Sequence, residues 1–252
     1  MNVFEVFIWF VIFSNIGWLW EVILYYITYR RFINRGFLNG PYCPIYGVGA
    51  LLFIFTTNQI QDPVLRGLAG GVIACLLEYI TSFTLEKLFH ARWWDYSNRP
   101  LNLNGRICFY GFLIFGLAAS VMPYVIQPIA ALTGTISEPA RTILSILLMV
   151  IFVMDIVATN ESLIKLNKAL KEYQKILDRR TSQLIDFIRK GKRAFEMRFE
   201  SGRKKARTVL TYQQRRIITA FPGLQSTRYN DALRNFRDLI ELTRRAGKKL
   251  KK

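Results

Sequence analysis

The sequence contains very few residues of the kinds that bind metals. Of its 252 residues, one is histidine (His90) and three are cysteines (Cys43, Cys75 and Cys108). Structural zinc sites take four cysteine or histidine ligands at short, regular spacings, and the sequence offers no such spacing. The odd number of cysteines and the lack of a CxxC pair also argue against a disulfide framework. We therefore expect neither a metal site nor a bound cofactor.

Motifs for catalysis and for nucleotide binding are missing as well. The chain has no GxxxxGK[ST] phosphate loop, no GxSxG nucleophile elbow and no recognisable nucleophile–base pair. Its first residues, MNVFEVFIWF, lack the basic start and the small-residue cleavage site of a signal peptide. The sequence thus predicts a protein that is not an enzyme, and an ATPase that drove it would be a separate chain.

Long apolar runs dominate the first 160 residues. A helix needs about 20 residues to cross the roughly 30 Å of bilayer hydrocarbon, and there its backbone groups must be satisfied internally. Five runs qualify, the second being short: residues 3–28, 42–57, 64–88, 108–132 and 142–160. We predict an all-α polytopic membrane helical bundle of about five spans at residues 1–160, embedded in the lipid bilayer of the cell membrane, followed by a helical tail at residues 161–252.

Positive charge is concentrated in the tail. Residues 161–252 hold 26 Lys and Arg against 9 Asp and Glu, whereas residues 1–160 are nearly neutral. Within residues 1–160 the loops after the first and third apolar runs are the basic ones. Because basic loops stay in the cytoplasm, we predict that both loops and the tail are cytoplasmic and that the N-terminus is outside.

A polar motif occurs twice, once in each basic loop. The stretches NRGFLNGPYCPIYG (residues 34–47) and NRPLNLNGRICFYG (residues 98–111) share NR, LNG, a cysteine and a final YG in the same order. We interpret them as parts of a parallel repeat of two-span units, residues 3–57 and 64–132, with the fifth span outside the repeat. Chance similarity between two turn-rich loops is the alternative.

Each motif predicts a helix that restarts at the membrane surface or slightly inside it. The candidate restart residues are Asn39, Gly40, Pro41, Cys43, Asn104, Gly105, Arg106 and Cys108. Pro41 is expected at the first helical position, where its missing N–H costs nothing. The free N–H groups of a restarting helix favour an anion, and a tight interfacial connection without a ligand is the alternative.

Acidic residues inside the predicted spans are costly and normally face a bundle interior or a wet cavity. Helical spacing places polar residues on one face of three spans, which predicts a polar cavity lined by Glu21, Glu78, Ser82, Glu86 and Asp155. For Glu21 and Glu86, near the cytoplasmic ends, ion pairing with Arg30, Arg35, Arg99 or Arg106 is favoured over a cavity role, which leaves Glu78 and Asp155 as the stronger cavity candidates. Either Glu78 or Glu86 is the repeat equivalent of Glu21.

The tail contains two amphipathic segments. Steps of three, four or seven residues from Leu163 to Ile188 suggest a heptad seam broken at Arg180, and residues 231–250 predict a second helix after the turn AFPGLQSTRYN. Anionic lipid head groups are the favoured partners of the basic charge. An acidic protein surface is an alternative, self-association stays open, and nucleic acid is not favoured because no recognisable module is present.

The first motif, together with LEYITSFTLEKLFHARWWDYSNRPLNLNGRICFYG (residues 77–111), resembles the bacterial family of putative ABC-transporter type IV proteins, also described as CmpB-like putative permeases. AFPGLQSTRYN resembles the C-terminal pattern of the same family. The resemblance implies a permease that works with an ATPase, and it carries over no substrate and no catalytic residue. Two functions therefore stand: a transport or channel component, or a membrane-anchored interaction or regulatory protein acting through the tail.

Overall fold

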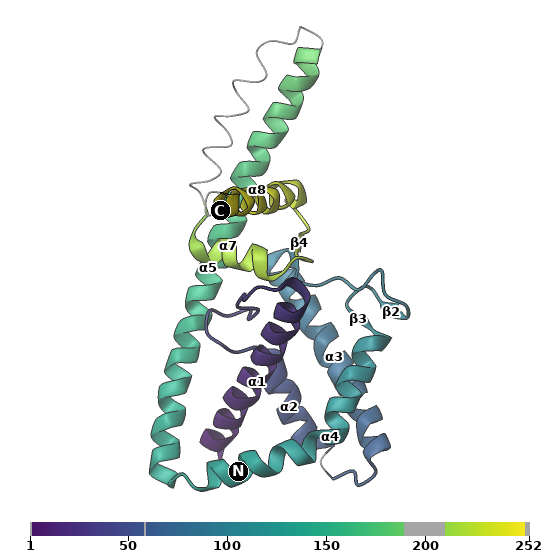
Figure 1. Cartoon of the computed structure of the whole chain (residues 1–252), viewed down its shortest axis with the longest axis vertical. Helices are drawn as coiled ribbons and strands as arrows, with labels where there is room; N and C mark the ends of the chain where they lie inside the picture. Colours follow the sequence, from purple (N-terminus) through teal and green to yellow (C-terminus); the bar gives the residue numbers. More distant parts are fainter. Residues whose placement is uncertain (1, 58, 189–209, 250–252) are drawn as a thin grey trace.

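The computed structural model describes residues 2–57, 59–188 and 210–249, with side chains in these ranges except at 180–188, 239 and 242–249 (Figure 1). Four helices are long and apolar enough to cross a membrane: α1 (Val3–Tyr29), α3 (Pro63–Phe89), α4 (Phe109–Gly134) and the first part of α5 (Glu138–Ile188). A shorter apolar helix, α2 (Pro44–Thr56), follows α1. The prediction of an all-α membrane helical bundle is confirmed.

The second predicted span is a half-length helix. α2 has 13 residues, and at about 1.5 Å per residue it measures about 20 Å, less than the hydrocarbon thickness. It packs mainly against α1, while α4 packs mainly against α3. The bundle is therefore built from two helix pairs, α1 with α2 and α3 with α4, and α5 lies against α1.

α1 and α3 begin and end in the same way. Asn2 caps α1 by accepting from the N–H of Glu5, and Asp62 caps α3 by accepting from the N–H of Leu65, both at 2.8 Å. Each helix has 27 residues and stops where a residue turns into the left-handed region, Arg30 (φ 50°) after α1 and His90 (φ 51°) after α3. A left-handed residue at this position is a common helix stop.

Small residues let the helices of each pair approach closely. A Cβ atom on Gly47 of α2 would lie 2.5 Å from the carbonyl O of Phe10 in α1. In the second pair, a Cβ atom on Gly70 of α3 would overlap the Cβ of Ala119 in α4. Such glycine contacts give close van der Waals packing where lipid removes the hydrophobic drive for association.

α4 changes direction along its length. It contains Pro123 and Pro128, and a proline inside a helix removes one hydrogen bond and bends it. Figure 1 shows the first part of α4 running beside α3, whereas its later part crosses the end of the bundle opposite the tail and leads to α5. The part of α4 that packs along α3 is consequently short, as α2 is.

The tail folds back onto the bundle. α5 continues without interruption through residue 160, so the change in composition there is not a break in the helix. Residues 210–249, called the cap here, comprise α7 (Tyr212–Ala220), β4 (Gln225–Ser226) and α8 (Asn230–Lys249), which pack around α5 (Figure 1). β4 pairs with β1 (Ala91–Arg92), just after α3. α8 matches the second helix predicted for the tail.

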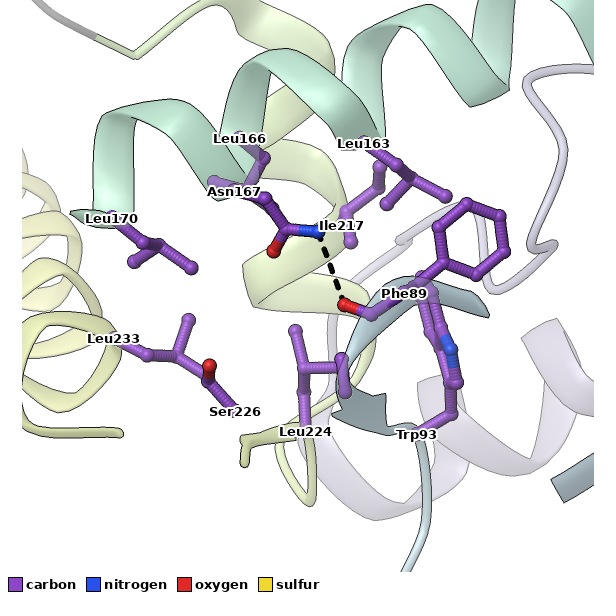
Figure 2. A pocket seen from close by; sticks show the side chains of 11 residues that line it. Phe89, Trp93, Leu163, Leu166, Asn167, Leu170, Ile217, Leu224, Ser226 and Leu233 are labelled. Atoms are coloured by element: carbon purple, nitrogen blue, oxygen red, sulfur yellow. Dashed lines mark hydrogen bonds between the residues drawn. The ribbon is translucent and has the colours of Figure 1, made fainter. Parts of the chain in front are cut away.

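The largest hydrophobic core lies between the cap, α5 and the end of α3. Its most buried side chains include Ile217, Leu233 and Phe236, each 1% exposed. Leu163, Leu166 and Leu170, the start of the predicted heptad seam, point into this core rather than toward another chain (Figure 2). The seam residues Leu184 and Ile188 have side chains outside the described residues. The Nδ2 of Asn167 donates to the carbonyl O of Phe89 at 3.0 Å and so satisfies the end of α3 (Figure 2).

Candidate functional site

The first motif segment, residues 30–43, turns back into the bundle after α1. The N–H of Cys43 donates to the carbonyl O of Ser14 at 2.9 Å, and Ser14 lies near the middle of α1. α2 starts directly after Cys43, so this helix begins about halfway along α1. The sequence suggested a restart at the membrane surface or slightly inside it, and in the structure the segment reaches the middle of α1.

Pro44, not Pro41, occupies the first helical position of α2. Cys43, the residue before it, is extended (φ −117°, ψ 98°), as expected for a residue that precedes proline. The segment around Pro41 forms a bend instead of a helix, and the N–H groups of Asn39 and Gly40 in it donate to a carboxylate of another helix. The helix begins only after the chain has left this contact.

That carboxylate belongs to Asp155 of α5. It accepts from the N–H of Asn39 (3.0 Å), the N–H of Gly40 (2.7 Å) and the hydroxyl of Tyr42 (2.6 Å), and also from Nδ2 of Asn39 and the hydroxyl of Thr159. Five donors satisfy the carboxylate, and none of them carries a positive charge. Asp155 thus fastens the first motif segment to α5.

Glu21 holds the same segment from the side of α1. Its carboxylate accepts from the Tyr46 hydroxyl at 2.7 Å and pairs with Arg35 at 3.3 Å. Arg35 also donates to the carbonyl O of Ala220 in the cap. Arg216 of α7 donates to the carbonyl O of Gly36 at 2.9 Å. The cap therefore contacts the first motif segment directly through two arginines.

The second motif segment, residues 90–108, forms a small hairpin. β2 (Asn102–Leu103) pairs with β3 (Ile107–Cys108), and the N–H of Arg106 donates to the carbonyl O of Leu103 at 3.0 Å. Asn104 (φ 54°) and Gly105 (φ 67°) are both left-handed, which a right-handed helix excludes and a hairpin turn of type I′ requires. Asn104, Gly105 and Arg106 consequently form this turn, and the helix restarts after Cys108.

Glu86 and Ser82 bind the arginine of that turn. Arg106 pairs with Glu86 at 2.9 Å and donates to the Ser82 hydroxyl at 3.1 Å, while Arg92 pairs with Glu86 at 3.2 Å. The ion-pair interpretation of Glu21 and Glu86 thus matches the contacts of both residues, with Arg35 and Arg106 as partners. These pairs fix each motif segment to the helix that precedes it.

Glu78 is in a different environment. It is 8% exposed, and its Oε1 accepts from the Tyr96 hydroxyl at 3.0 Å. Its Oε2 is buried and has no hydrogen-bond partner among the described residues. A Cβ atom on Gly111, in the first turn of α4, would lie 3.6 Å from this oxygen. Because Gly111 faces Glu78 and Phe112 faces Gly71, α4 begins beside the middle of α3.

The two helix pairs place similar residues at similar positions. Cys43 and Cys108 are the N-cap residues of α2 and α4. In the first pair, one acid, Glu21, binds both a tyrosine and an arginine. In the second pair these two roles are divided: Glu78 binds a tyrosine, and Glu86 binds an arginine. Both acids of α3 thus share features with Glu21, and the contacts do not select one of them as its equivalent.

Two hollows of the described structure are lined by other residues than these acids. A void of about 20 Å³ is enclosed by the cap core (Figure 2), and a groove of about 390 Å³ runs along α3 and α4 beside Cys75, Leu76 and Phe112. Both have mainly apolar walls, and none of the five predicted cavity residues lines either one. Within the described ranges no group of three His, Cys, Asp or Glu residues is arranged to hold a metal ion.

Several residues of the site were not predicted from the sequence. Tyr42 and Tyr46 lie inside the first motif, and Tyr96 lies just before the second. This closeness to the motifs is the one sequence feature that could have marked the three tyrosines as site residues. Arg216 gave no signal, because it is one of many basic residues in the tail and contacts a segment about 180 residues earlier.

Comparison with known proteins agrees with this arrangement of membrane helices. The family model described as "Putative ABC-transporter type IV" matches residues 8–160, which include α1 to α4, both motif segments and the apolar part of α5. No curated protein and no solved structure matches the chain. Because the family model covers more than half of the sequence, the chain belongs to the putative ABC-transporter type IV family.

Proposed function

We propose that this chain is the membrane component of a transport system and that α2 and α4 border its polar path. The observation that carries the proposal is that both helices begin near the middle of the bundle, with Glu21 and Glu78 beside their first turns. In transporters, helices that start inside the membrane direct their N-terminal N–H groups toward substrates or ions. Membership of the family described as "Putative ABC-transporter type IV" supports the same function.

The proposal includes the parallel repeat. Two 27-residue helices that end at left-handed residues, each followed by a motif segment and a cysteine N-cap, are what duplication of one unit produces. The units would then surround an axis along the membrane normal. Energy from ATP would have to come from a separate ATPase chain, because this sequence has no phosphate-binding loop.

The test uses a strain that lacks the gene, screened for a growth defect across ions, osmolytes and toxic solutes. The wild-type chain should restore growth, whereas Glu21→Gln combined with Glu78→Gln should fail at normal membrane abundance. Glu5→Gln is the matched control, since Glu5 pairs with Arg141 at the other end of α1. Full complementation by the double variant would contradict the proposal. ATP hydrolysis by the complex purified in mild detergent tests the ATPase partner separately.

The second candidate function is a membrane-anchored interaction or regulatory protein that acts through its basic tail. It is favoured by the length of α5, which continues beyond the cap (Figure 1). Lys168→Glu and Lys171→Glu change exposed positions of α5 and leave the buried leucines in place. Loss of complementation by these variants alone, with the glutamine variants fully active, would favour the second function.

A further inference from the structure

We propose that Glu78 is a reversible proton-binding site in the middle of the bundle. Glu78 is 8% exposed, with Oε1 bound to the Tyr96 hydroxyl and Oε2 buried without a partner among the described residues. Oε2 faces the first turn of α4, at 3.6 Å from the position of a Cβ atom on Gly111. The proton would bind to Oε2, because Oε1 already accepts a hydrogen bond.

Among the described residues, Glu21, Glu86 and Asp155 have no buried oxygen that lacks a hydrogen-bond partner. Glu21 has Arg35 and Tyr46 as partners, and Glu86 has Arg92 and Arg106. Asp155 accepts from two backbone N–H groups, an amide and two hydroxyls. Each of these carboxylates is stabilised in its charged form, so a proton would displace favourable contacts. In the described structure Glu78 has one neutral donor and no ion pair.

Opposing effects act on the two protonation states of Glu78. Burial without a cation favours the neutral acid. The Tyr96 hydroxyl and the N-terminal end of α4 favour the carboxylate, and Cys108 leaves the N–H groups of that end without a side-chain cap. Burial also raises the pKa of Tyr96 above its usual range, so its hydroxyl stays protonated and remains a donor. A carboxyl group balanced in this way can gain and lose a proton near neutral pH.

The charged and titratable groups around Glu78 come from three elements and one loop. Cys75 lies on the same helix, Cys108 caps α4, Tyr96 lies in the second motif segment and Glu21 belongs to α1. Arg106 is bound to Ser82 and Glu86, which lie about one and two turns from Glu78 along α3.

Proton binding would influence the second motif segment. The Tyr96 hydroxyl contacts Glu78, and the Tyr96 N–H donates to the carbonyl O of Gly105 in the hairpin turn at 2.8 Å. A carboxylate accepts a stronger hydrogen bond than a neutral carboxyl group, so loss of the proton tightens the contact between α3 and the hairpin. This inference goes beyond the proposed transport function, although a proton site here could supply its coupling ion.

The test is covalent labelling by dicyclohexylcarbodiimide, which attacks protonated carboxyl groups in apolar surroundings. The full chain in lipid vesicles is treated at a series of pH values and the adducts are located by mass spectrometry. Glu78 should be labelled, and the labelling should fall at least about tenfold between about pH 5.5 and about pH 8.5. Glu86 and Asp155 serve as internal controls in the same sample and should stay unlabelled.

Tyr96→Phe sharpens the test, because loss of the donor to the carboxylate should extend labelling of Glu78 to higher pH. Absence of a Glu78 adduct in the wild-type chain, adducts that do not change with pH, or equal labelling of Glu86 and Asp155 would overturn the proposal. The readout needs neither a substrate nor an ATPase. A failed transport assay would therefore leave the proton site standing, and a failed labelling assay would leave transport standing.

Discussion

Asp155 of α5 binds Asn39 of the first motif segment through two hydrogen bonds to the same carboxylate oxygen, one from the backbone N–H (3.0 Å) and one from Nδ2 (2.8 Å). The two residues are 116 positions apart in sequence. The contact connects a helix outside the two helix pairs to the segment that carries α2 into the bundle. Its loss should therefore affect the position of α2 as well as the stability of the protein.

Asp155→Asn should destabilise the protein and loosen the first motif segment. The amide cannot accept from both backbone N–H groups and the Tyr42 hydroxyl as a carboxylate does, and charge-assisted hydrogen bonds contribute about 1.5–3 kcal/mol each. We expect a loss of about 2–4 kcal/mol, measured as a lower unfolding temperature in detergent. Glu161→Gln, at an exposed position of the same helix, is the control. Equal unfolding temperatures for the two variants would show that the hydrogen bonds of Asp155 do not stabilise the protein.

Cys43 and Cys108 should resist a membrane-impermeant maleimide from both sides of the membrane. They are 7% and 5% exposed, and a buried thiol in apolar surroundings seldom forms the reactive thiolate. If instead both lay at the inner membrane surface, both would become accessible when that face is opened, so the labelling distinguishes the two depths. Tyr212→Cys, at a position 82% exposed, is the positive control. In the Asp155→Asn variant Cys43 should become reactive while Cys108 stays protected.

Gly47→Ala should be destabilising, whereas Gly49→Ala on the same helix should not. At Gly47 the new methyl group would lie 2.5 Å from the carbonyl O of Phe10, and at Gly49 its nearest neighbour would be 3.5 Å away, in Leu77. Overpacking costs about 1–3 kcal/mol, while alanine in a helix gains about 0.5–1 kcal/mol over glycine. Unfolding temperatures of the two variants in one detergent provide the measurement. A tolerated Gly47→Ala would mean that α1 and α2 are further apart.

Phe236→Ala should detach the cap from α5. Phe236 is 1% exposed and stacks on Tyr173 of α5 with ring centroids 4.5 Å apart. Replacing a buried phenylalanine by alanine costs about 3–5 kcal/mol, which should appear as faster proteolysis of the cap and lower unfolding temperature. Tyr212→Ala, at an exposed cap position, should behave as wild type. Removal of residues 161–252 should be more severe, since it uncovers Phe89 and Trp93.

Reporter fusions should place the cap in the cytoplasm and the N-terminus outside. The basic residues of the two motif segments and of the tail predict this orientation, and the structure brings all three to one end of the bundle (Figure 1). A phosphatase reporter before Met1 should be active, and a fluorescent reporter after Lys252 should fluoresce. The opposite pattern would reverse the topology without changing the fold.

The positions of the helices follow from local features of the sequence, because apolar runs, caps and turns involve residues close together in the chain. The four long spans, the second helix of the tail and the family motifs could all be predicted from residues close together in the chain. The acids of the spans were also identifiable, since an acid in hydrocarbon requires a partner wherever it lies.

The partners of the acidic residues in the spans depend on the tertiary structure. Asp155 finds its donors on a segment more than 110 residues away, Arg216 of the cap reaches Gly36, and Leu163 packs under the cap rather than in a coiled coil. No spacing in the sequence encodes these contacts, because hydrogen bonds and packing depend on which surfaces meet when the helices assemble. The depth of the two motif segments follows from the same contacts: once Asp155, Ser14 and Glu78 hold them, α2 and α4 must begin inside the bundle.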